Sequence, residues 1–96
     1  MIGEPGIVDL LKSRKDQAEA ETRLRKRDYS ESCDLELRLS RALMEADLDG
    51  RPDPWLDSER MKAETGRMRA RRAWNDAQRR EIQAARRYAA FCQGMI

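Results

Sequence analysis

Six arginines in the second half of the chain are the side chains best suited to recognising a partner by charge. A planar guanidinium matches the geometry of phosphate and carboxylate groups. From residue 55 onward ten basic side chains accompany five acidic ones, whereas the first 54 residues carry ten basic and thirteen acidic ones. Helical spacing would gather these side chains on one side of a helix, the arginine face, which comprises Arg69, Arg72, Arg79, Arg80, Arg86 and Arg87.

Three interpretations of the arginine face are open. In the first, the arginines face water and pair with acidic side chains of the first half, which is the usual state of a charge run; the acids concerned are Asp16, Glu19, Glu21 and Asp28. In the second they contact an acidic protein partner. In the third they bind nucleic acid phosphates, although Asp76 and Gln83 interrupt the face and no known DNA-binding or RNA-binding motif accompanies it.

An acidic stretch before the middle of the chain copies half of a calcium loop. Glu45, Asp47 and Asp49 have the ligand spacing, and Gly50 follows. The twelfth position, where a bidentate glutamate closes such a site, is Leu56. The sequence therefore predicts an acidic turn and no metal site.

The residues needed for catalysis are missing or isolated. The chain has no histidine, which removes the commonest general base and metal ligand. Cys33 and Cys92 are too few for a zinc site or a disulfide framework. No phosphate loop, dinucleotide fingerprint or nucleophile elbow is present. We expect a protein that is not an enzyme and that uses no cofactor.

A repeat of seven residues organises the second half. Its positions are mostly alanine, which would allow a partner helix to approach more closely than usual. The repeat comprises Leu56, Ala63, Ala70, Ala77, Ala84 and Phe91.

Two long helices follow from the positions of the helix breakers. Pro52, Pro54 and Gly50 interrupt helix between two periodic segments, and Asp53 is suited to capping the second. We predict a lead-in over 1–6, a helix over 7–47, a turn over 48–53 and a helix over 54–92, with one domain spanning 7–96. Asp28 and Glu31 have capping-box spacing, so we also expect a kink or break near 28–32.

Equal lengths on either side of a tight turn predict an all-α antiparallel helical hairpin. Folding the chain at the turn pairs residues whose numbers sum to about 102, which matches apolar positions along both helices. On this pairing Cys33 and Cys92 are too far apart for a disulfide.

The hairpin would have a thin core and an uncovered apolar stripe. Leucine, isoleucine, valine and phenylalanine number only 15 of 96 residues, so a second chain would have to complete the core. We expect a four-helix homodimer. Trp55 and Trp74 are either anchors of an interface or ordinary core residues. The predicted protein interface comprises Leu37, Met44, Met61, Met68, Trp74 and Ile82.

The function expected from this pattern is a small protein-protein interaction module, such as an adaptor, chaperone, assembly factor or inhibitor. The alternative is a nucleic-acid-binding accessory protein that uses the arginine face. The first residues show no export signal and no apolar run that could span a membrane. With only two cysteines, the chain is expected to be cytoplasmic and to have no membrane contact.

Overall fold

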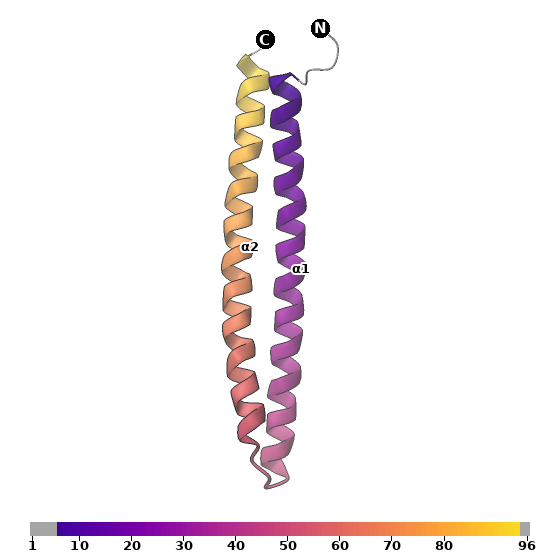
Figure 1. Cartoon of the computed structure of the whole chain (residues 1–96), viewed down its shortest axis with the longest axis vertical. Helices are drawn as coiled ribbons and strands as arrows, with labels where there is room; N and C mark the ends of the chain where they lie inside the picture. The colour runs from indigo at the N-terminus through magenta and orange to yellow at the C-terminus, as the bar shows by residue number, and fades with distance from the viewer. Residues whose placement is uncertain (1–5, 95–96) are drawn as a thin grey trace.

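A computed structural model describes residues 6–94 as two long antiparallel helices. Helix α1 spans Ile7–Leu48 and helix α2 spans Pro54–Gly94, with 42 and 41 residues (Figure 1). The molecule measures 73 × 24 × 14 Å, and Gly6 and Gly94 lie at the end opposite the turn. The predicted all-α hairpin is confirmed. The first five positions of the predicted lead-in, together with Met95 and Ile96, lie outside the described residues.

The turn between the helices is built by backbone hydrogen bonds and one side-chain cap. Gly50 adopts φ +68°, and the amides of Gly50 and Arg51 donate to the carbonyls of Asp47 and Ala46 at 3.1 and 2.9 Å. These two backbone hydrogen bonds together form a Schellman motif, which needs one residue in the left-handed conformation. On the other side, the Asp53 carboxylate accepts hydrogen bonds from the amides of Trp55 and Leu56 at 3.0 and 3.2 Å. The predicted cap at Asp53 is confirmed.

The break predicted near 28–32 is wrong. α1 continues without interruption through this segment, because neither Asp28 nor Ser32 is available as a cap. The Ser32 hydroxyl donates to the Asp28 carbonyl at 2.9 Å within the helix, and the Asp28 carboxylate lies 3.5 Å from the Arg25 guanidinium. Tyr29 packs against Trp74 on the other helix, so tertiary contact also holds this turn in place.

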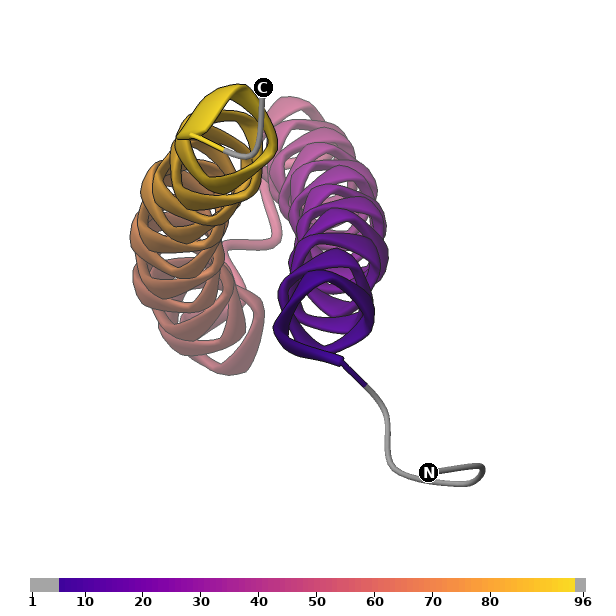
Figure 2. The ribbon, with the colours of Figure 1, turned by 90° about the horizontal axis from the view of Figure 1, so that it is seen from above.

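The register of the two helices is the one expected from their lengths. Three cross-helix contacts, Glu36 with Arg67, Tyr29 with Trp74 and Lys15 with Tyr88, each join residues whose numbers sum to 103. Viewed from above, the helices stay side by side along their whole length while tilting relative to each other (Figure 2). A seven-residue repeat produces this gentle winding.

The core of the hairpin consists of small side chains. Among the described residues only Ala63 and Ala77 are buried, at 8% and 1% exposure, and both belong to the predicted seven-residue repeat. Larger side chains on the contact line, such as Leu39, Tyr29 and Trp74, remain partly exposed. We call this line between α1 and α2 the alanine seam. It brings the helices together but buries little apolar area.

Two glycines should respond in opposite ways to alanine. Gly66 lies inside α2, and a Cβ added there would meet nothing within 4 Å. Gly66→Ala should therefore raise the free energy of unfolding by about 1 kcal/mol through helix propensity. Gly50→Ala should lower it by about 1 kcal/mol, because a left-handed conformation is strained for alanine. Urea unfolding followed by circular dichroism measures the free energy of unfolding of both variants. A change in the same direction for the two would contradict the prediction.

The alanine seam should not tolerate larger side chains. Ala77→Leu would force the helices apart at the most buried position, with an expected loss of about 1–3 kcal/mol of unfolding free energy. Ala90→Leu is the matched control, because Ala90 is exposed on the same helix; its effect should stay within about 0.5 kcal/mol. Thermal unfolding of both variants tests this, and an unchanged Ala77→Leu protein would contradict close packing at the seam.

Candidate interaction surfaces

Five of the six predicted interface residues lie exposed along one face of the hairpin. Each directly follows a partly buried residue of the contact between the helices, as Leu37 follows Glu36 and Met68 follows Arg67. Each step of one residue along an α-helix rotates the side chain by about 100° around the helix axis. All five side chains are therefore rotated away from the seam in the same direction. We call this the methionine face, and its members with their exposures are Leu37 at 50%, Met44 at 61%, Met61 at 57%, Met68 at 48% and Ile82 at 52%.

The antiparallel arrangement brings the two rows of the methionine face together. When two helices run in opposite directions, side chains rotated from their contact in the same sense fall on the same face of the pair. The register places Leu37 between the levels of Met61 and Met68. The four residues Leu37, Met44, Met61 and Met68 therefore lie on one face in the half of the hairpin nearest the turn, and Ile82 lies farther along.

Trp74, the sixth predicted interface residue, lies at the seam and not on the methionine face. Its ring is 5.6 Å from that of Tyr29, with the planes tilted by 31°. The Arg71 guanidinium lies 5.4 Å from the centroids of both rings, a cation–π distance. The indole Nε1 is buried without a hydrogen-bond partner in the described part of the chain. Trp74 thus holds α1 and α2 together.

All six residues of the arginine face are exposed, and in the described part of the chain none of them forms an ion pair with α1, the arrangement of the first interpretation. Within residues 6–94, Arg79 forms the single ion pair of this set, with Asp76 of its own helix at 3.8 Å. Three of the four acids named for this pairing have partners on α1, since Glu19 pairs with Lys15, while Glu21 and Asp28 both pair with Arg25. Partners three or four residues away are reached more easily than those across the hairpin.

Three of the arginines point directly away from α1. Arg72, Arg79 and Arg86 are seven residues apart, and each comes two residues after an alanine of the seam. A step of two residues rotates the side chain by about 200° around the helix axis. The three guanidinium groups therefore lie along the back of α2, the side opposite the seam. Consecutive members are separated by a rise of about 10 Å along the helix. They form a straight positive row facing solvent.

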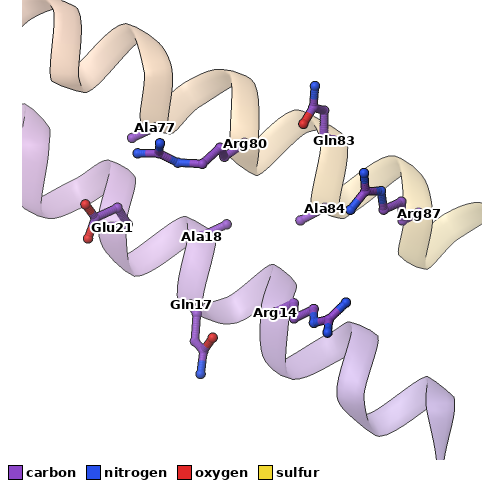
Figure 3. Close-up of a pocket in the computed structure, with 9 residues that line it drawn as sticks. All are labelled: Arg14, Gln17, Ala18, Glu21, Ala77, Arg80, Gln83, Ala84 and Arg87. Atoms are coloured by element: carbon purple, nitrogen blue, oxygen red, sulfur yellow. The ribbon is translucent and has the colours of Figure 1, made fainter.

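Two of the three remaining predicted arginines contribute to a groove near the chain ends, and Arg69 does not line it. Arg80 and Arg87 of α2 and Arg14 of α1 flank a groove of about 490 Å³ whose base is formed by small side chains (Figure 3). Ala18, Ala77 and Ala84 line it between the helices. Arg14 was not predicted from the sequence, although the register places it within a turn of Arg87. We call this the arginine groove.

A second groove lies nearer the turn and is mainly apolar. Leu35, Leu39 and Trp55 line it together with Ala63 and Gly66. Three of these residues come directly before a residue of the helix contact: Leu35, Trp55 and Gly66. They are therefore rotated away from the seam in the direction opposite to the methionine face. Because opposite rotations fall on opposite faces, the hairpin presents two different apolar surfaces. Only the methionine face was predicted from the sequence.

Two polar contacts tie the helices together along the seam. Glu36 accepts a hydrogen bond from Arg67, and this bond is the main cause that raises the pKa of Arg67. Toward the chain ends, the Lys15 ammonium lies 5.7 Å from the centre of the Tyr88 ring. A hydrogen bond with Cys92 is the main cause that raises the pKa of Tyr88. Because both pKa values are raised, Arg67 and Tyr88 stay protonated at neutral pH.

Other kinds of site find no support in the described residues. Within 6–94, no three His, Cys, Asp or Glu side chains come together in a way that could hold a metal ion. Neither helix, over the same residues, contains an apolar stretch that could cross a bilayer. The thiols of Cys33 and Cys92 are free.

Comparison with known proteins gives no assignment. No protein-family model, no curated protein and no solved structure matches the chain. The surfaces themselves are therefore the basis for a functional proposal.

Proposed function

We propose that the protein is a non-enzymatic helical interaction module that self-associates through the methionine face and docks a protein partner on a helical surface. The observation that supports this is the distribution of apolar side chains. The buried residues of the described hairpin are two alanines, while methionine, leucine and isoleucine lie about half exposed on one face. Contiguous exposed apolar side chains of this size mark interaction surfaces.

The exposed area supports association with a second chain. The chain exposes 7686 Å². A compact monomer of 11.2 kDa would expose about 5,700 Å², so the hairpin carries an excess of about 2,000 Å². Obligate dimers bury about 2,000–5,000 Å² in total. Pairing of two hairpins, each losing half this excess, would reach that range.

The chemistry of the methionine face fits helix-on-helix docking. Methionine has three rotatable bonds and a polarisable sulfur, so Met44, Met61 and Met68 can adapt to the grooves of a facing helix. Charges on the flanks would set the orientation and rate of association more than the affinity. The two free thiols fit the cytoplasmic setting expected from the sequence. Adaptor, chaperone, assembly factor and inhibitor roles all use such a surface.

Placing a charge on the methionine face should abolish self-association. In Met68→Asp and Leu37→Asp the new carboxylate would have to be buried against apolar side chains of the second chain, at a cost that no helix contact of this size offsets. Sedimentation should change from dimer to monomer at micromolar concentration, while circular dichroism keeps the helical signal. Thr65→Asp is the matched control, because Thr65 is exposed on the back of α2 and should remain dimeric. A monomeric unmodified protein would contradict the proposal.

Nucleic acid binding is the second candidate function, and one observation favours it. Within residues 6–94 five of the six side chains of the arginine face form no ion pair, so their charge is available to a polyanion. The straight row of Arg72, Arg79 and Arg86 could follow a phosphate backbone. Net charge of only +2 limits non-specific attraction, which is why this function ranks second.

If nucleic acid binds, it should depend on the arginine row and on salt. The double variant Arg79→Ala/Arg86→Ala should weaken binding and reduce the salt slope of the affinity by about 2, because each phosphate contact releases close to one counterion. Arg38→Ala/Arg41→Ala removes the same charge from exposed positions on α1 and serves as control. Gel shifts at two salt concentrations measure this. Equal losses in both variants would show that only net charge matters.

A further inference from the structure

We propose that the arginine groove receives an acidic helix of a protein partner, which carries carboxylates on its flanks and small apolar side chains between them. This inference rests on the proposed docking function, and it names the surface that is used and the chemistry of the partner. Three guanidinium groups and a base of alanine define the groove (Figure 3). Its position, its charge, the spacing of its arginines and its base each bear on the ligand.

The arginine groove and the methionine face lie on opposite sides of the hairpin. Lys15 and Tyr88 contact each other across the seam. Arg14 comes directly before the first of these residues and Arg87 directly before the second, while Arg80 is about two helical turns from Arg87 on the same side. Residues of the methionine face follow the contact residues instead, so they are rotated in the opposite direction. A dimer formed through the methionine face therefore leaves the groove accessible.

The positive charge of the arginine groove is not neutralised by the groove's own side chains. Within residues 6–94, Arg14, Arg80 and Arg87 form no ion pair. Glu21 also lines the groove, but its carboxylate is held by Arg25 at 2.8 Å. Arg14 and Arg87 lie within a turn of the same level on opposite sides of the groove, so like charges repel there. A carboxylate between them would relieve this repulsion and accept charge-assisted hydrogen bonds.

The acids of neighbouring turns do not supply that carboxylate. Asp76 forms its ion pair with Arg79, at 3.8 Å. Asp16 directly follows a residue of the helix contact and is therefore rotated toward the methionine face. Glu81 lines a different pocket, together with Ile82 of the methionine face. Charge complementarity therefore favours an acidic ligand from outside the described part of the chain.

The spacing of the arginines matches that of side chains on a helix. Arg80 and Arg87 are seven residues apart, which is a rise of about 10 Å along α2. Two carboxylates seven residues apart on a helix that lies alongside α2 have the same separation, so each can meet one of these guanidinium groups. A third carboxylate, on the other flank of that helix, would meet Arg14 of α1.

The base of the arginine groove favours a peptide over a nucleic acid. Ala18, Ala77 and Ala84 lie between the helices at the bottom of the groove (Figure 3). Small apolar side chains of a peptide helix can pack on these methyl groups, whereas a phosphate backbone has no apolar group to place there. Single-stranded nucleic acid is usually held by stacking on aromatic side chains, and none of the described residues that line the groove is aromatic.

A helical peptide of defined charge tests the proposal directly. The probe is an alanine-based helix of about 21 residues, about 30 Å long, with blocked ends. It carries two glutamates seven residues apart on one flank and a third glutamate on the other, and in the matched peptide every glutamate is glutamine. Calorimetric titration of the full chain should show the acidic peptide binding at least about tenfold more tightly, because the neutral peptide lacks the charge-assisted hydrogen bonds. Equal affinity for the two peptides, or binding of neither, would overturn the proposal.

Gln83→Glu would supply a carboxylate to the groove from within the chain. Gln83 lines the groove three residues after Arg80 and four before Arg87, so the new acid can pair with both. The affinity for the acidic peptide should fall at least about tenfold, while the midpoint of thermal unfolding does not fall. Gln93→Glu adds the same charge on the back of α2 near the same end, and should change the affinity about twofold or less. Equal losses in the two variants would mean that only net charge matters, and would overturn the groove assignment.

Removing arginines distinguishes the arginine groove from the row on the back of α2. Arg14→Ala/Arg87→Ala should weaken binding of the acidic peptide at least about tenfold. Arg72→Ala/Arg86→Ala removes the same charge from the back of α2 and should change the affinity about twofold or less. A single-stranded oligonucleotide that binds the unmodified protein more tightly than the peptide, and loses affinity in Arg14→Ala/Arg87→Ala, would make nucleic acid the occupant and overturn the proposal.

Sedimentation of the same samples separates this proposal from self-association. A dimer that does not bind the acidic peptide would overturn the groove assignment and leave self-association intact. A monomer that binds the peptide and loses it in Gln83→Glu would overturn self-association and leave the groove assignment intact.

Discussion

Close contact between two helices along a line of alanines is the constraint on which the rest of this molecule depends. Ala77 is almost completely enclosed and Ala63 nearly so, which shows that the backbones approach each other there. A buried methyl group contributes only about 0.8 kcal/mol, so the seam defines the geometry of the hairpin better than it stabilises it. The ring contact of Tyr29 with Trp74, under Arg71, and the ion pair of Glu36 with Arg67 add stability at mid-length.

A seam of small residues leaves the large apolar side chains outside. On one face the methionines and Leu37 lie exposed near the turn, and on the other Leu35 and Trp55 line a groove. The back of α2 carries the row of Arg72, Arg79 and Arg86, which is separate from the methionine face. A hairpin with three chemically different sides can associate with a second copy through one of them while others stay accessible.

The sequence predicted the hairpin and its register because both depend on features that are local or periodic. Pro54, Gly50 and Asp53 determine the turn, and the seven-residue spacing determines the seam. The predicted break at 28–32 was wrong, because capping-box spacing alone does not show that Tyr29 packs across the hairpin. Of the three interpretations of the arginine face, ion pairs across the helices do not form in the described residues, because neighbours on α1 reach Glu19 and Glu21 first. The arginine groove and the apolar groove were missed, since each is shared between residues of both helices and appears only when the rotation of each helix is known.

The single tight turn also determines the order in which the hairpin can assemble. Contacts across the seam join residues 31 apart at Glu36 and Arg67, 45 apart at Tyr29 and Trp74, and 73 apart at Lys15 and Tyr88. Because the entropy of closing a loop rises with its length, the pair nearest the turn forms at the lowest cost and each later pair extends it. Contacts between the helices therefore form in sequence from the turn toward the chain ends. Amide protons should exchange fastest near Ile7 and Gly94, where the contacts form last and are lost first.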